Sequence, residues 1–298
     1  MSLLLLASAA FAVAMLIREH EMLRATGPGA AVFAIGVTLC AALRFGFRAP
    51  ACERRRFVRD LAEYVAIFGL ICMIGAVASY PDAAGSSGMV DPALARADRL
   101  LRFDWLRWYA LVADHRVLQI VGSAAYQSIY LTPAVVLGYF AWSERGADAY
   151  RFLLSFWVAA AITLLLFRWL PAAGPFAYLW HGPIHYMPQS ALYQAELIPA
   201  LQQHAIRMID LDALHGLVSA PSFHAASGVL YIIFAWQVPR LRWPLIALNL
   251  LMIAATPVEG THYLIDVIAG VAVALAAVAL TRPFALPYRM GQGRLAEA

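Results

Sequence analysis

The stretch GTHYLID, residues 260–266, places a histidine and a carboxylate at the start of a long apolar run near the C-terminal end of the chain. The stretch APSFH, residues 220–224, places another histidine at the start of an earlier apolar run. A helix start exposes backbone N–H groups and the positive end of the helix dipole, so it favours anions. The two stretches together predict a phosphate site, and the apolar runs behind them place it at a membrane surface.

The composition indicates an integral membrane protein. Of the 298 residues, 62% are hydrophobic and 13% are charged, which is far from the balance of a soluble domain. Eight nearly uncharged runs have about the length that a helix needs to cross the hydrocarbon of a bilayer. These runs are 3–17, 30–43, 61–79, 117–142, 152–170, 222–238, 244–257 and 262–281. We therefore expect an all-α polytopic membrane protein with about eight transmembrane helices. No basic residue precedes Leu3, which favours a retained first helix over a cleaved signal peptide.

The placement of arginine predicts the orientation of the bundle. Positive residues accumulate in cytoplasmic loops, and this chain, which lacks lysine, has most of its arginines after the second, fourth, sixth and eighth runs. They are Arg44, Arg48, Arg54, Arg55, Arg56, Arg59, Arg145, Arg151, Arg240, Arg242, Arg282, Arg289 and Arg294. If eight helices alternate, both termini are cytoplasmic, and both histidine stretches face the periplasm of a bacterial inner membrane. The long loop 171–221 then lies on that outer side.

Residues 91–116 are the exception to this charge pattern, because their arginines fall on the outer side. Leucines and tryptophans alternate with these arginines at near-helical spacing, which is typical of a helix in the headgroup plane. We expect an interfacial amphipathic helix there. We divide the chain into a two-helix N-terminal addition, residues 1–50, and a six-helix core, residues 51–298, which includes the interfacial helix 91–116 and the outer loop 171–221.

His262 and Asp266 form the most informative pair of polar residues. They are four residues apart and therefore neighbours on one face of a helix, where the carboxylate can accept the Nδ1–H of the imidazole. The Nε2 atom is then free to attack phosphorus, as in other covalent enzymes whose nucleophile is oriented by a third group. The alternative is a structural hydrogen bond. A carboxylate inside an apolar run favours the functional interpretation, since such groups are costly in a membrane.

His224 is the expected partner of His262. We expect Pro221 to be the first residue of its helix, Ser222 to offer a hydroxyl and an amide to phosphate oxygens, and His224 to protonate a leaving oxygen from the first turn. His224 is interpreted as functional because His262 and Asp266 are expected on the same side of the membrane. The remaining histidines of the outer side, His181, His185, His204 and His215, are interpreted as having no role.

The pattern Pro-Ser-x-His, followed after one helix by His-x3-Asp, resembles the second and third motifs of the type 2 phosphatidic acid phosphatase superfamily. The resemblance covers about residues 61–281 and implies a six-helix core without a metal or another cofactor. It implies that His262 is the nucleophile that becomes phosphohistidine, that Asp266 orients it, that His224 is the general acid, and that Ser222 binds phosphate.

The chain departs from that family in the residues expected to hold phosphate. The first motif of the family has a lysine and an Arg-Pro pair, whereas this chain has only Arg168 near a proline at that place. Thr256 stands where the third motif usually has an arginine. These departures resemble the branch that contains inositol phosphorylceramide synthase and sphingomyelin synthase. A phosphate needs a cation, so Arg168 is the first candidate ligand and Arg207 the second. Tyr126 is a candidate for the cavity wall, although packing is the commoner role in a spanning helix.

We therefore expect an enzyme that acts at the outer face on a lipid phosphate or phospholipid through a phosphohistidine, as a phosphotransferase or phosphatase. Water as the acceptor gives a phosphatase, whereas a lipid hydroxyl gives a transferase, and the resemblance favours the transferase. No nucleic acid partner is expected. Two other classes stay open. A metal enzyme would use His224, His262 and Asp266 as ligands, which is a poor set because no H-E-x-x-H is present. A transporter or non-catalytic lipid-binding protein would also place charges within the membrane.

Overall fold

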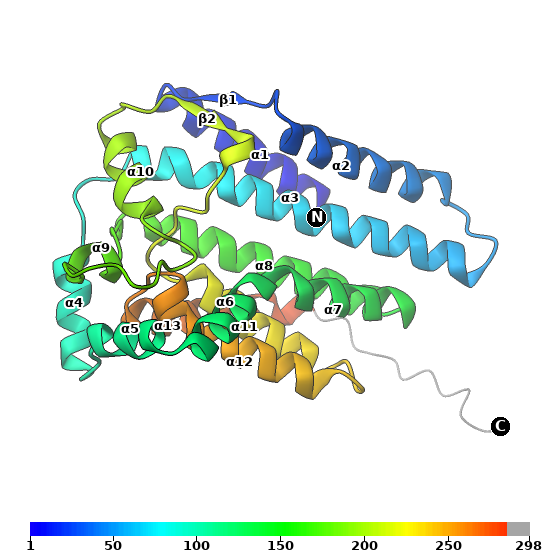
Figure 1. Cartoon of the computed structure of the whole chain (residues 1–298). Coiled ribbons are helices and arrows are strands. Elements are labelled where there is room, and N and C mark those ends of the chain that lie inside the picture. Colours follow the sequence, from blue (N-terminus) through cyan, green and yellow to red (C-terminus); the bar gives the residue numbers. More distant parts are fainter. Residues whose placement is uncertain (285–298) are drawn as a thin grey trace.

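The computed structural model describes residues 1–284, which form a bundle of helices with a layer of short elements at one end (Figure 1). The arginines Arg289 and Arg294 lie outside the described residues, as does the end of the expected domain 51–298. The elements are α1 (Ser2–Arg18), β1 (Met22–Arg24), α2 (Pro28–Gly46), α3 (Glu53–Ala84), α4 (Asp91–Leu100), α5 (Trp105–Asp114), α6 (Arg116–Gln127), η1 (Ser128–Tyr130), α7 (Leu131–Trp142), α8 (Gly146–Phe167), α9 (Pro175–Leu179), α10 (Tyr193–Gln202), β2 (Met208–Asp210), η2 (Leu211–Ala213), α11 (Phe223–Ala235), α12 (Arg242–Glu259), α13 (Leu264–Thr281) and η3 (Arg282–Phe284).

The structure confirms the all-α membrane fold. Each of the eight apolar runs coincides with a helix or, for 117–142, with α6, η1 and α7 together. In the described part of the chain, five helical segments are long and apolar enough to cross a membrane by themselves. They are α2, α3, the segment Arg116–Trp142, α8 and α13, while α1 and α11 are apolar but shorter. A polytopic membrane protein is thus established, and the number of eight spans stays a prediction.

Aromatic side chains form the centre of the bundle. Phe68 of α3 lies against Phe152 and Phe156 of α8, with ring centroids 6.4 and 4.7 Å apart, and Phe234 of α11 meets Phe152 edge-on at 5.1 Å. All four rings are buried. Helix association within a bilayer depends on such packing, because lipid tails are as apolar as the side chains themselves. This core fixes α11 relative to α3 and α8, and α11 begins at the end where the site lies.

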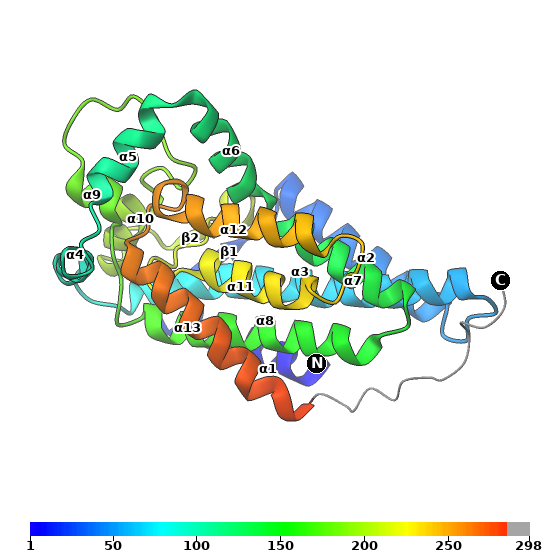
Figure 2. The ribbon, with the colours of Figure 1, turned by 90° about the horizontal axis from the view of Figure 1, so that it is seen from below.

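The short elements α4, α5, α9 and α10 gather at the end of the bundle where α11 and α13 begin (Figures 1 and 2). The arginine-rich segment 44–59, which comprises the end of α2, the loop after it and the start of α3, lies at the opposite end, as does the turn between α11 and α12. Both histidine stretches are therefore at one end of the molecule, away from the most basic loop. Which of the two ends faces the cytoplasm stays a prediction.

Residues 91–116 do not form the single interfacial helix expected from the sequence. They form α4 and α5, separated by a turn in which Arg102 has a φ of 56°. The physical reason is a local cap, because the Asp104 carboxylate accepts a hydrogen bond from the Arg107 amide at 3.1 Å and starts a new helix there. The region 171–221 is also more than a loop, since it contains α9, α10, β2 and η2.

The N-terminal residues pack against both the core and the outer region. Helices α1 and α2 both contact α3. The strand β1 pairs in parallel with β2 through Met22–Arg24 and Met208–Asp210, and the Ala30 amide at the start of α2 donates to Asp212 at 2.9 Å. These two strands are the only ones in the described residues. The division into residues 1–50 and 51–298 stays a prediction.

Candidate active site

The first histidine stretch forms the capped start of α11. Ser222 is the N-cap, and its hydroxyl accepts a hydrogen bond from the Ala225 amide at 3.4 Å, so α11 begins at Phe223. Pro221 therefore precedes the helix, whereas the sequence suggested that it would be the first helical residue. His224 lies in the first turn as expected. Its imidazole is thus carried by a helix whose start is defined by a serine cap.

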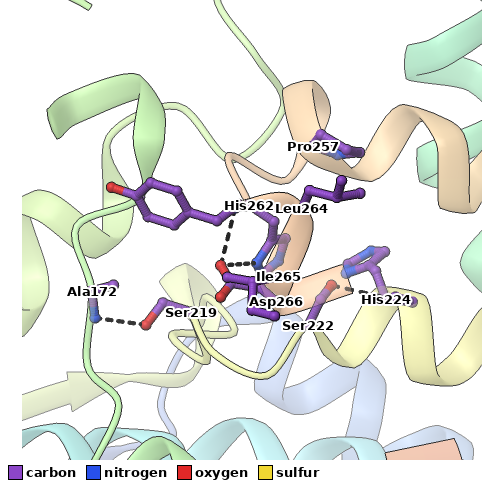
Figure 3. A network of polar contacts seen from close by, with 12 residues as sticks. Ala172, Ser219, Ser222, His224, Pro257, His262, Leu264, Ile265 and Asp266 are labelled. Carbon is purple, nitrogen blue, oxygen red and sulfur yellow. Dashed lines mark hydrogen bonds and ion pairs between the residues drawn. The ribbon is translucent and has the colours of Figure 1, made fainter. Parts of the chain in front are cut away.

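The second histidine stretch forms a tight turn between α12 and α13. The His262 amide donates to the Pro257 carbonyl at 3.2 Å, Thr261 has a φ of 50°, and α13 begins only at Leu264. The expectation that His262 and Asp266 share one helical face is therefore wrong in its detail, because His262 precedes the helix. The turn still brings the His262 ring over the first turn of α13, where Asp266 lies (Figure 3).

Asp266 faces His262 without the hydrogen bond expected from the sequence. The His262 Nδ1 atom lies 3.8 Å from Asp266 Oδ2, and both side chains are buried. The Oδ2 atom accepts a hydrogen bond from the Tyr263 amide at 3.0 Å, which caps α13. Asp266 Oδ1 and His262 Nδ1 have no partner within residues 1–284. The pair is therefore placed to interact, with the carboxylate held toward Nδ1 by its capping bond, and hydrogen bonds at active sites often tighten only when substrate is bound.

Helices α11 and α13 meet at their starts. The Ser222 amide donates to the Asp266 carbonyl at 3.0 Å. Gly270 lies at the crossing, where an added Cβ would be only 2.3 Å from the Ser222 carbonyl oxygen. A residue larger than glycine cannot occupy this position without separating the helices. The contact brings the two histidine stretches together, although a third helix separates them in the sequence.

Two carboxylates of α4 accept hydrogen bonds from residues at the start of α13. Asp98 accepts hydrogen bonds from the Leu264 and Ile265 amides, both at 2.9 Å, and Asp91 accepts one from the Tyr263 hydroxyl at 2.9 Å. Burial raises the pKa of Asp98, while the two amide bonds act in the opposite direction. These contacts correct one expectation. Because Asp98 takes the exposed amides at the start of α13, they are not free to bind a substrate phosphate.

Tyr126 of α6 lies against His224. Its ring is stacked on the His224 imidazole with centroids 4.0 Å apart, and its hydroxyl lies 3.2 Å from His224 Nδ1. Gly260 keeps this region narrow, because an added Cβ would be 2.7 Å from the His262 ring and 3.0 Å from the Tyr126 hydroxyl. Tyr126, His224 and His262 all line one cavity of about 840 Å³. The structure therefore brings these three sequence-predicted residues together, with Asp266 behind His262.

The other three predicted residues do not line the cavity. Arg168 lies 3.9 Å from Asp82. Its guanidinium also reaches the place where a Cβ on Gly85 would be, beside Glu19. Arg207 donates to the His204 carbonyl at 3.4 Å. Ser222 is fully buried and serves as a cap. Arg168 was selected because it lies at the outer end of an expected helix, and Arg207, in the outer loop, was the second candidate; each carries its charge toward groups outside the cavity.

Other residues contribute to the site although the sequence did not single them out. His215 lines the same cavity, stacked on Tyr193 with ring centroids 3.8 Å apart, and burial lowers its pKa. Glu259 accepts from the Tyr186 hydroxyl at 2.6 Å, and its carbonyl accepts from the Ser190 amide at 2.8 Å. The Ser190 hydroxyl lies 3.3 Å from that of Tyr126. The sequence could have identified Glu259, because it is a carboxylate directly before the stretch 260–266. Nothing in the local sequence distinguished His215.

The fold and the site together define a class of protein: a polytopic membrane protein with two histidines and a carboxylate gathered at one end of its bundle, of which His262 and Asp266 are buried. Over residues 1–284, no three His, Cys, Asp or Glu side chains come together in a way that could hold a metal ion. A family model described as the PAP2 superfamily matches residues 92–280, which is more than half of the chain.

The chain therefore belongs to the PAP2 superfamily. The matched region runs from α4 into α13 and includes Tyr126, His224, His262 and Asp266. Membership indicates an enzyme of lipid phosphate chemistry, either a phosphatase or a phosphotransferase. No curated protein and no solved structure matches the chain.

Proposed function

We propose that the protein is a lipid phosphotransferase that works through a phosphohistidine on His262. The observation that carries the proposal is the shared cavity: His224 and His262 come from separate elements and line one space at one end of a bundle of apolar helices. Asp266 lies behind His262 Nδ1, so Nε2 is the nitrogen left for attack. The site lies at the end of the molecule opposite the arginine-rich loop, which supports its placement on the outer face of the membrane.

The proposed reaction has two displacements at phosphorus. In the first, His262 Nε2 forms a P–N bond, the P–O bond to the leaving alcohol breaks, and His224 gives its proton to that oxygen. In the second, the hydroxyl of an acceptor attacks the phosphohistidine, the P–N bond breaks, and His224 takes the acceptor proton. Tyr126 holds His224 Nδ1, so Nε2 of that ring is available for both transfers. Asp266 stabilises the positive charge that His262 gains as it attacks.

The charge of the cavity supports a phosphodiester as donor. Among the described residues, neither arginine nor lysine lines the cavity, whose polar lining is histidine, tyrosine, glutamine, serine and threonine. A phosphomonoester carries up to two negative charges and needs cations, whereas a phosphodiester carries one. A phospholipid donor and a lipid hydroxyl acceptor fit this lining, in line with the resemblance to the inositol phosphorylceramide synthase branch. Hydrolysis of a simple lipid phosphate, such as phosphatidate or an isoprenyl phosphate, is the second candidate, and family membership favours it equally.

The test uses the full chain in detergent with two probes, phosphatidic acid for phosphate release and phosphatidylinositol with fluorescent ceramide for headgroup transfer. We expect headgroup transfer that a chelator does not reduce. His262→Ala removes the nucleophile, so we expect a loss of roughly 10³-fold or more. His181→Ala is the matched control, since His181 is exposed and outside the cavity.

Each other result identifies a different protein. Phosphate release without transfer identifies a phosphatase, and activity lost with chelator identifies a metal enzyme. Binding of both probes without turnover identifies a lipid-binding or transport protein. An adduct found by mass spectrometry on the peptide that contains His262, phosphoinositol with phosphatidylinositol as donor or phosphate with phosphatidic acid, would support the intermediate directly, and an adduct on any other residue would contradict it.

A further inference from the structure

The cavity that begins at the two histidines continues far along α3. From this helix its lining includes Ser79, Ala76, Gly75, Cys72 and Gly69. Gly69, Cys72, Ala76 and Ser79 follow one another at steps of three or four residues, and Gly75 lies three residues from Cys72 and four from Ser79, so all five form one face of the helix. At the histidine end the lining is polar, whereas along α3 it is made of small and apolar groups. The cavity is thus a polar chamber that continues into an apolar arm.

Three of the helices that line the apolar arm are α2, α3 and α8. The face of α3 is opposed by Ala160 and Leu164 of α8, and Phe33 of α2 closes the arm at its far end beside Gly69. All three helices belong to the segments that are long and apolar enough to cross a membrane. The arm therefore lies within the hydrocarbon layer, and its wall includes a residue of the N-terminal helices that precede the family match.

The length of the arm matches one leaflet of a bilayer. From Ser79 to Phe68, the lining spans eleven residue steps of α3, which corresponds to about 16 Å at ~1.5 Å per residue. The hydrocarbon core of a bilayer is about 30 Å thick, so one leaflet is about 15 Å. An acyl chain that starts at a headgroup near the histidines would end where Phe33 and Phe68 close the arm.

Glycine makes the arm wide enough for a hydrocarbon chain. No atom lies within 4 Å of the position that a Cβ on Gly75 would occupy, so the bare backbone of α3 faces open space there. At Gly69, the nearest atom is a ring carbon of Phe33 at 3.7 Å. Glycine inside a helix is unfavourable compared with alanine. In return for this cost, Gly75 leaves space beside the helix that a larger side chain would fill.

We propose that the apolar arm binds one acyl chain of the lipid substrate, with Gly75 setting its width, so that the phosphate of the same lipid lies between His224 and His262. We identify the occupant as an acyl chain of the substrate because the arm and the two histidines belong to one continuous cavity. A lipid held by its chain places its headgroup at a fixed depth, and orientation of this kind makes attack by a buried nucleophile efficient. The inference deepens the proposed function and rests on it for the identity of the headgroup site.

The test measures where a chain binds, independently of turnover. The probe is phosphatidic acid with a diazirine at the middle of one palmitoyl chain, offered to the full protein in phosphatidylcholine nanodiscs and cross-linked by light. We expect mass spectrometry to find the label on α3 between residues 68 and 79 and on α8 near Ala160. Gly75→Leu fills the arm, and we expect this labelling to fall about tenfold.

Two further variants keep the test sharp. Gly138→Leu is the control, because Gly138 lies on α7 with the same partial exposure, has no atom within 4 Å of its Cβ position and is outside the cavity. Ala160→Leu narrows the arm from its opposite wall and should reproduce the loss if Gly75→Leu folds poorly. Labelling spread over the outward faces of the helices, or unchanged in both narrowing variants, would overturn the proposal.

A separate variant distinguishes this proposal from the proposed function. His262→Ala should lose turnover and keep the labelling on α3 and α8. If His262→Ala keeps its turnover while Gly75→Leu still abolishes labelling, the chain site stands and the phosphohistidine mechanism fails. If labelling is insensitive to both narrowing variants while His262→Ala is inactive, the mechanism stands and the chain site fails.

Discussion

Tyr126 is the residue that joins the two halves of the site. Its hydroxyl lies 3.2 Å from His224 Nδ1 and 3.3 Å from the Ser190 hydroxyl, and its ring stacks on the imidazole. A histidine that passes a proton in both directions must keep one nitrogen toward the substrate throughout the reaction. In the proposed mechanism the Tyr126 hydroxyl would provide this orientation, because it lies at Nδ1 and leaves Nε2 toward the cavity.

Tyr126→Phe tests this orientation. The substitution removes the hydroxyl and keeps the stacked ring, so we expect the melting temperature to change little and kcat to fall about tenfold, the value of one hydrogen bond of about 1.4 kcal/mol. Tyr139→Phe is the matched control, since it makes the same change in the same segment, Arg116–Trp142, outside the cavity. An equal decrease in the two variants would show that the hydroxyl of Tyr126 does not orient His224.

Glu21 is a buried carboxyl group outside the spanning helices. It lies between α1 and β1, it is 6% exposed, and neither carboxyl oxygen has a partner within the described residues. Burial, followed by the charge of Glu19, raises the pKa of Glu21 from 4.5 to about 7. The folded state therefore holds a proton on Glu21 at a pH where the unfolded state has lost it.

Stability should consequently fall as the pH rises from 4.5 to 7. In this window the unfolded state binds fewer protons than the folded state, so each step in pH favours unfolding, and above pH 7 the loss is complete at roughly 3 kcal/mol. Glu21→Gln is neutral at every pH. We expect its melting temperature to match that of the unsubstituted protein near pH 4.5 and to exceed it at pH 8.

Thermal unfolding in detergent across this pH range measures the difference. Glu53→Gln serves as the control, because Glu53 is an exposed glutamate in the first turn of α3. A stabilisation by Glu21→Gln that is the same at pH 5 and pH 8 would contradict a titration of Glu21.

At the scale of elements, the site depends on how closely α11 and α13 approach each other. The Ser222 amide donates to the Asp266 carbonyl, Gly270 leaves no room for a side chain at the crossing, and Asp98 of α4 caps α13 from the other side. The histidines are carried on the starts of elements that are fixed by these backbone contacts. A small shift at the crossing therefore changes the distance between the two imidazoles.

Gly270→Ala should separate the two helices. Its Cβ would lie 2.3 Å from the Ser222 carbonyl oxygen, and we expect a destabilisation of about 1–3 kcal/mol together with a loss of activity. Gly36→Ala on α2 is the control, since no atom lies within 4 Å of that position. Alanine favours a helix over glycine by up to about 1 kcal/mol, so the control should melt at the same or a higher temperature. Two variants with the same melting temperature would show that the crossing tolerates a methyl group.

At the scale of the whole molecule, the chain places its chemistry and its strongest basic loop at opposite ends (Figure 1). The segment 44–59 around the loop after α2 is rich in arginine, and this loop contains the exposed Cys52, whereas His181 is exposed near the histidine end. Positive residues stay on the cytoplasmic side of a membrane. The expected orientation is therefore a cytoplasmic Cys52 and an outer His181.

Labelling of intact cells with a membrane-impermeant maleimide tests this orientation. We expect Cys52 to react only after the cells are opened and a cysteine in His181→Cys, made in a Cys52→Ser background, to react in intact cells. The remaining cysteines, Cys40 and Cys72, are partly buried on spanning helices, so Cys52→Ser alone gives the background signal. The reverse labelling pattern would place the site in the cytoplasm.

The sequence by itself determined the class of fold and the identity of the central side chains. Apolar runs of membrane length require helices, since a bilayer leaves backbone groups no other partners, and the two short motifs named His224, His262 and Asp266. The pattern of apolar residues predicted the boundaries of the helices less accurately. It missed the Asp104 cap that divides residues 91–116, and it placed His262 inside a helix that begins at Leu264.

Only the tertiary structure decided which residues share the cavity. Arg168 and Arg207 were the expected phosphate ligands, yet their charges lie outside the cavity, while His215, which had no local signal, lines it. The same holds for the face of α3 at Gly75, which lines the cavity and has no atom within 4 Å of the position that its Cβ would occupy. The physical reason is that a cavity is formed by side chains from several helices, and their separation depends on packing between elements, which periodicity within one element does not encode.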